Sequence, residues 1–197
     1  MARQLFLCMT LGTLLSTGAA AENYTPAQRP VLDVVMVNRV PTGSLEVGTA
    51  RARVRFIFQE AGIRIVWTPE SETPEQATRG VLPIHVVVLG EDAADHLIAG
   101  DAGRLAFAIP SARRLYVHYD RVSGLAREHN VQPGWFLGVV IAHELAHVVL
   151  PGAGHADSGL MALALSPDPK VTPAFTRREA QLLRKNLLGE PAMLAQR

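Results

Sequence analysis

The stretch from Pro133 or Trp135 to about Leu150 constrains the fold more than any other part of the chain, because it is apolar almost all round (GWFLGVVIAHELAHVVL). A helix without a polar side has to be buried on most of its faces. Pro151, Gly152 and Gly154 follow it at once and predict its end. The histidines and the glutamate inside this stretch are costly to bury unless they have partners.

The rest of the chain predicts a sheet of short strands with one amphipathic helix before the apolar stretch. Runs of β-branched and apolar residues predict strands at 31–37, 63–67, 83–90 and 113–120. Residues 104–109 (RLAFAI) predict one more strand, and Pro110 behind it favours an edge position. The predicted helices, besides the apolar one, span about 44–62 and 177–188, each with a glycine at its end. The fold class is therefore α+β.

The N-terminus has the layout of a cleaved secretory signal. Arg3 precedes an apolar run from Leu5 to Leu15, and small residues stand at 19–21. We expect residues 1–21 to be a signal peptide and residues 22–197 to form a single domain that is secreted or periplasmic. Cys8 lies inside the predicted signal, so that the mature chain has no thiol and no disulfide.

The charge balance excludes several classes of partner. Without Arg3, the 19 Lys and Arg become 18, against 18 Asp and Glu. Such a balance gives no basic surface for nucleic acid or anionic lipid. No segment reaches the ~20 apolar residues of a transmembrane helix, so we expect a soluble mature protein.

The apolar helix carries His143, Glu144 and His147 at H-E-x-x-H spacing. Positions i and i+4 lie on one helical face, so both imidazoles can reach one metal ion. Glu144 projects beside them and could take a proton from a water molecule that zinc acidifies. The pattern thus predicts Zn²⁺ with Glu144 as a general base, although two core histidines without a metal would also fit it.

A catalytic zinc ion needs a third protein ligand, and two residues compete for that place. His155 follows the predicted helix end, where glycines on both sides of Ala153 permit a tight reversal. Glu179 lies well downstream, as the third ligand does in another class of zinc peptidase. Thr176 and Glu179, however, form a T-x-x-E capping box before an apolar pair, which already gives that glutamate a partner. We therefore predict His155.

The stretch HELAHVVLPGAGHADSGLM resembles the metzincin zinc endopeptidases, whose signature is H-E-x-x-H-x-x-G-x-x-H with a methionine turn. It is also similar to small exported bacterial proteins with H-E-x-x-H, a histidine and G-x-M. The resemblance implies a mixed, mostly parallel twisted sheet with an antiparallel edge strand, a buried active-site helix and a C-terminal helix. It also implies zinc on His143, His147 and His155, Glu144 as general base, and Met161 beneath the metal. Here His155 follows His147 by eight residues instead of six.

The function favoured by the sequence is an exported zinc-dependent peptidase whose partners are peptide or protein substrates. Two alternatives remain open at this point: a zinc hydrolase of cell-wall or other non-protein amides, and a non-catalytic zinc-binding module. Glu144 argues against the module, because a closed structural site has no use for a base. The sequence indicates neither the cleavage specificity nor the oligomeric state.

Three polar side chains of the predicted strand at 113–120 receive no catalytic role. Tyr116, His118 and Asp120 alternate with apolar residues. We expect all three on the surface or on the open face of the sheet.

Overall fold

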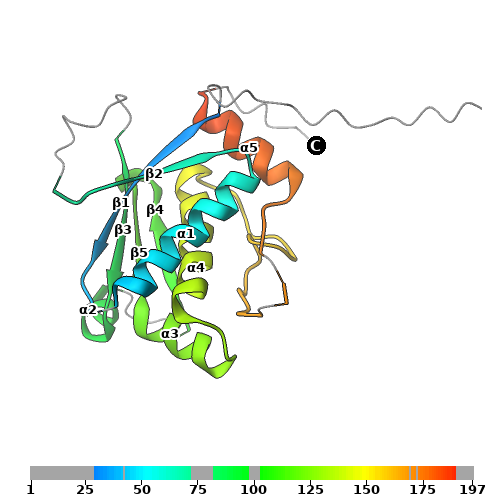
Figure 1. Cartoon of the computed structure of the whole chain (residues 1–197). Coiled ribbons are helices and arrows are strands. Elements are labelled where there is room, and N and C mark those ends of the chain that lie inside the picture. Colours follow the sequence, from blue (N-terminus) through cyan, green and yellow to red (C-terminus); the bar gives the residue numbers. More distant parts are fainter. Residues whose placement is uncertain are drawn as a thin grey trace, which may run out of the picture.

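A computed structural model describes residues 29–41, 43–71, 82–97, 103–168, 170–171 and 173–189. Within these ranges one twisted sheet carries helices on its face and at its ends (Figure 1). The predicted signal peptide, residues 1–21, lies outside the described residues, as do residues 72–81.

The sheet has five strands in the order β2-β1-β3-β5-β4. Four of them run parallel, and β4 pairs antiparallel with β5 at the end of the sheet. The prediction of a mostly parallel sheet with an antiparallel edge strand is therefore right. The strands span β1 (Val31–Asn38), β2 (Arg64–Thr68), β3 (Ile84–Leu89), β4 (Ala106–Ile109) and β5 (Arg114–His118).

Two helices, α1 and α4, lie side by side against the sheet (Figure 1). Alternate residues of the interior strand β1, namely Leu32, Val34 and Met36, belong to the hydrophobic core beneath these helices. The helices span α1 (Ser44–Glu60), α2 (Glu91–Leu97), α3 (Tyr119–Glu128), α4 (Pro133–Val149) and α5 (Arg177–Leu187), with a short 3-10 turn at Pro110–Ala112.

The helix α4 is buried nearly all round, as its apolar sequence predicts. Every residue between Pro133 and Val149 is buried except Pro133, Trp135 and His147. With 17 residues, α4 falls short of the ~20 that a bilayer requires. None of the helices in the described ranges combines the length and the hydropathy needed to cross a membrane.

Two glycines let α4 approach α1 closely. A Cβ at Gly134 would lie 2.6 Å from the Glu46 carbonyl oxygen, and one at Gly138 would lie 2.8 Å from that of Ala50. Because these glycines are four residues apart, they form one smooth strip on α4. The depth at which α4 sits, and with it the position of every side chain that it carries, depends on this contact.

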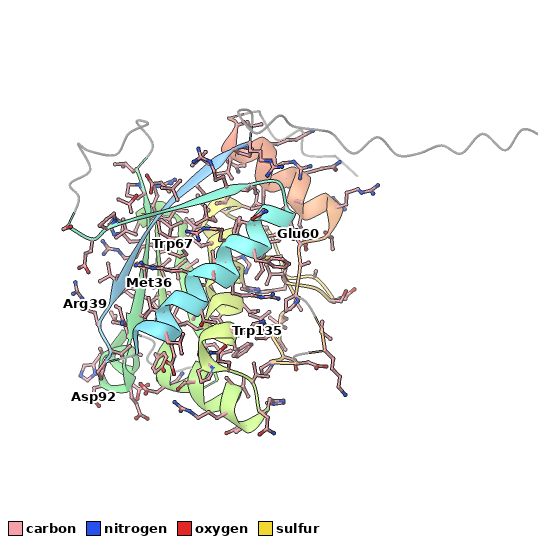
Figure 2. The ribbon with its side chains drawn as sticks, in the orientation of Figure 1. Met36, Arg39, Glu60, Trp67, Asp92 and Trp135 are labelled. Atoms are coloured by element: carbon pink, nitrogen blue, oxygen red, sulfur yellow. The ribbon has the colours of Figure 1, made fainter. Side chains whose placement is uncertain are left out.

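Arginine side chains on both sides of α1 tie it to its neighbours. The Arg51 guanidinium lies 5.4 Å from the ring centre of Trp67 on β2. Arg53 lies 4.8 Å from the ring centre of Trp135 on α4. Trp67 and Trp135 lie on opposite sides of α1 (Figure 2). These cation–π contacts link α1 to β2 on one side and to α4 on the other.

The predicted strand at 113–120 is wrong at its C-terminal end. The strand β5 stops at His118, and Tyr119 and Asp120 begin α3. His118 is 1% exposed and not a surface residue. Its Nδ1 accepts a hydrogen bond from the Arg121 amide at 3.4 Å and caps α3, while its Nε2 lies 3.3 Å from the Asp95 carboxylate. The alternating sequence pattern continues to Asp120, but β5 ends at His118 because this histidine caps α3.

Candidate metal centre

His143 and His147 lie one turn apart on α4 and direct their rings at the same point. Their Nε2 atoms are 3.0 Å apart. Tetrahedral zinc with Zn–N bonds of ~2.0–2.1 Å holds two ligand nitrogens about 3.3 Å apart. The pair therefore has close to the spacing that one ion requires.

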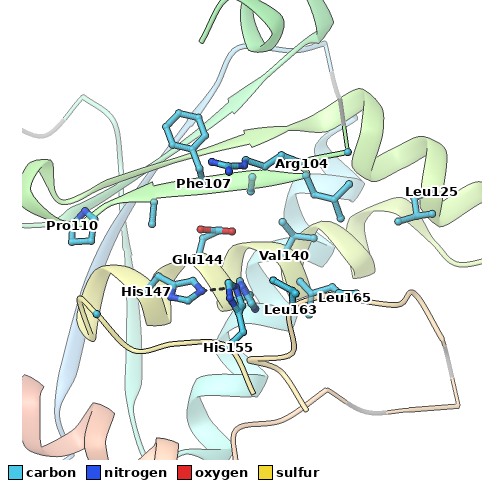
Figure 3. Close-up of a pocket in the computed structure, with 17 residues that line it drawn as sticks. Arg104, Phe107, Pro110, Leu125, Val140, Glu144, His147, His155, Leu163 and Leu165 are labelled. Carbon is cyan, nitrogen blue, oxygen red and sulfur yellow. Dashed lines mark hydrogen bonds between the residues drawn. The ribbon is translucent and has the colours of Figure 1, made fainter. Parts of the chain in front are cut away.

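His155 returns to this pair from the turn that follows α4. The last backbone bond of the helix joins the Leu150 amide to Ala146, and Gly152 then reverses the chain with a φ of +87°. Gly154 has no positive φ, so that one of the two predicted glycines makes the reversal. The His155 ring stacks on His143, with ring centres 5.3 Å apart. Ring nitrogens of His143, His147 and His155 all lie within 4.8 Å of one another (Figure 3).

Hydrogen bonds with the backbone act on two of the three rings. The Nδ1 of His143 donates a hydrogen bond to the Leu160 carbonyl at 2.7 Å. Since a carbonyl oxygen can only accept, the hydrogen stays on Nδ1 and the lone pair of Nε2 faces the cluster. A hydrogen bond with the backbone of Ala153 acts on His147 and raises its pKa slightly against the effect of burial. A bond to the second ring nitrogen, such as that of His143, is typical of histidines that bind a metal.

Burial keeps the two helix histidines neutral. It lowers the pKa of His147 to about 4, with further contributions from the charges of His143 and His155. The pKa of His143 is also lowered, mainly by burial. Neutral imidazoles with inward lone pairs are the donor set that a borderline-soft ion such as Zn²⁺ takes. The cluster supports the predicted zinc cofactor.

Glu144 lies beside the histidines and is only 8% exposed. Burial raises the pKa of its carboxyl group to about 7, and the charge of Arg104 acts in the opposite direction. A carboxyl group in this range can both accept and release a proton near neutral pH.

The histidines and Glu144 line one open cleft of about 690 Å³. One wall of the cleft is the edge strand β4 with the residues just before it, and the other is α4 with the turn that carries His155 (Figure 3). Much of the remaining lining is apolar and comes from four separate segments: Leu105, Leu125, Val140, Leu163 and Leu165. His155 is exposed, so this side of the cluster is open to solvent.

Met161 lies next to the centre but is part of the main core. It is 4% exposed, and its carbonyl accepts a hydrogen bond of 2.7 Å from the Ala156 amide. This bond closes the turn that contains the Leu160 carbonyl, the partner of His143. The position of Met161 therefore helps to fix the His143 ring.

Glu179 is outside the cluster and caps α5 as predicted. Its carboxylate accepts from the Thr176 amide at 2.7 Å, and the Thr176 hydroxyl accepts from the Glu179 amide at 3.2 Å. Its charge still raises the pKa of His143, as the smallest of four contributions. Asp157, two residues after His155, is exposed.

Arg104 and the leucines of the turn are not among the site residues predicted from the sequence. Arg104 is the first residue of the edge strand predicted at 104–109, and this position is the sequence signal that could have placed it near the cleft. Leu163 and Leu165 follow Met161 closely but reach the cleft through the fold of the turn.

The fold resembles that of a known metzincin-type protein. Archaemetzincin from Methanopyrus kandleri is 18% identical, with a TM-score of 0.52 over 83% of this chain and 98% of that chain. A zinc-dependent peptidase from Methanocorpusculum labreanum is 15% identical, with a TM-score of 0.49 over 77% of this chain and 99% of that chain. No protein-family model and no curated protein sequence matches this chain. The likeness to archaemetzincin shows a zincin-like fold.

Proposed function

We propose that this protein is an exported zinc-dependent peptidase. One observation carries the proposal: three histidine rings converge on one point beside a buried glutamate, within an open cleft. The zincin-like fold shared with archaemetzincin agrees with it. Export is inferred from the signal-like N-terminus, which also suggests kinship with small exported proteins that carry the same motif.

In this proposal His143, His147 and His155 hold the zinc ion through their ring nitrogens. Zinc supplies Lewis-acid chemistry, since it polarises a peptide carbonyl and acidifies a water molecule. Glu144 takes the proton of the attacking water and then donates it to the amine that leaves. Glu144 does not bind the ion, which separates its role from that of the histidines.

The edge strand β4 provides the surface along which a peptide can lie. It pairs with β5 on one side and stands at the end of the sheet on the other. Residues 103–108 line the same cleft as Glu144. An extended peptide that adds to β4 by main-chain hydrogen bonds would therefore place one of its carbonyls near the histidines.

The test uses residues 22–197 produced with zinc. We expect one zinc ion per chain by mass spectrometry of the metal content. A peptide library should be cut, and a chelator should stop the cleavage. Glu144→Gln should keep the metal and lose cleavage, whereas the matched variant Glu128→Gln, at an exposed position of α3, should behave like the wild type. A zinc-bound protein that cuts no peptide would contradict the proposal.

A further inference from the structure

The cleft carries one arginine whose role the proposed reaction does not explain. Arg104 lies two residues before β4 and extends along the strand above the Glu144 carboxylate (Figure 3). Histidines apart, Arg104 and Glu144 are the charged side chains among the described residues that line the cleft. Its positive charge therefore stands in a cleft whose other walls are largely apolar.

Hydrogen bonds fix the backbone from which Arg104 extends. Arg121 of α3 donates from Nη1 to the Arg104 carbonyl at 3.2 Å. The Nη2 of Arg121 pairs with the Asp95 carboxylate of α2 at 2.8 Å. The start of β4 is thus tied to two helices, while the Arg104 side chain itself is exposed toward the cleft. A ligand in the cleft therefore meets the Arg104 side chain, whose backbone is fixed by these bonds.

A guanidinium group recognises a carboxylate better than any neutral group, because it can donate two parallel hydrogen bonds. Glu144 supplies negative charge at the reaction centre and is itself buried, whereas Arg104 is exposed. We propose that Arg104 selects substrates with an acidic residue within two positions of the bond to be cut. This inference rests on the proposed peptidase function and names the substrate class of the same cleft.

A second role for Arg104 has to be distinguished from this one. Its charge could act on Glu144 alone and so affect the reaction with every peptide alike. A residue that selects substrate instead changes the ratio between acidic and neutral peptides. The ratio, and not the absolute rate, is the quantity that decides between the two roles.

The first measurement compares peptides that differ by Glu, Gln or Lys next to the scissile bond. We expect zinc-loaded wild type to favour Glu over Gln about tenfold in kcat/KM, the size of one charge-assisted hydrogen bond. Arg104→Gln should abolish this preference, and Arg104→Glu should favour Lys. The control Arg39→Gln removes an exposed arginine that pairs with Glu70 and should keep the wild-type ratio.

The second measurement detects binding without turnover. Fluorescein-labelled Glu and Gln peptides are titrated by anisotropy into zinc-loaded Glu144→Gln, with and without Arg104→Gln. We expect the Glu peptide to bind about tenfold more tightly only when Arg104 is present. Equal binding of the two peptides, or an Arg104→Gln effect of the same size on both, overturns the inference. Failure of the peptidase proposal is recognised separately, because the wild type would then cleave neither peptide.

Discussion

Replacing Gly138 with alanine should weaken the contact between α1 and α4. The new Cβ would lie 2.6 Å from the Arg53 Cβ and 2.8 Å from the Ala50 carbonyl oxygen. Since carbon atoms pack at about 3.5–4.0 Å, α4 has to move away from α1 by roughly 1 Å. Overpacking of this kind costs ~1–3 kcal/mol, and the better helix propensity of alanine returns ~1 kcal/mol. The expected net loss of stability is therefore about 0–2 kcal/mol.

The matched control is Gly48→Ala in the middle of α1, where a Cβ would meet nothing within 4 Å. That variant should gain about 0.5–1 kcal/mol from helix propensity alone. Urea unfolding of the zinc-free proteins, followed by circular dichroism, measures both changes as shifts of the midpoint at an unchanged slope. If Gly138→Ala proves as stable as Gly48→Ala, the close approach of the two helices is not what holds α4 in place.

Three further predictions concern the centre and the N-terminus. Glu144→Gln should bind zinc as tightly as the wild type and lower kcat at least about 100-fold, so that a loss of metal would show Glu144 to be a ligand. His155→Ala should weaken zinc binding at least about tenfold in chelator competition. Glu179→Ala should keep the zinc and cost only ~1 kcal/mol of stability, because it removes the cap of α5. If Glu179→Ala loses the zinc and His155→Ala keeps it, Glu179 is the third ligand. N-terminal sequencing of exported protein should begin at or near Glu22, and material that keeps Met1 would contradict the signal peptide.

The parts of the structure that could be predicted from sequence are those fixed by local pattern. The helix α4 could be predicted because its apolar residues leave no polar face. The capping box of α5 lies within four residues, and both of its hydrogen bonds form as predicted. His143, Glu144 and His147 share one helix, so their mutual geometry follows from its repeat.

The helix α3 could not be predicted because its start depends on a distant partner. The alternation of Tyr116, Val117 and His118 continues the strand pattern, and histidine is not among the residues that usually cap helices. His118 caps α3 through Nδ1 while its Nε2 is held by Asp95 on α2. Asp95 lies 23 positions before His118, so the residues next to His118 in the sequence do not reveal this contact. The position of Arg104 near Glu144 could not be predicted for the same reason. The two residues are distant in the sequence, and only the order of the strands and the packing of α4 bring them together.

The longer connection between the second and third histidines shows which property of the motif matters. His155 stands eight positions after His147, two more than in the metzincin signature. The additional length is taken up by a tight turn in which the Ala153 amide bonds to the Leu150 carbonyl at 3.0 Å and Gly152 adopts a positive φ. The His155 ring thereby still returns to within 4.9 Å of the His147 ring centre. A metal site depends on where the ring nitrogens meet and not on the number of residues between them, so a pattern with fixed spacing would overlook this chain.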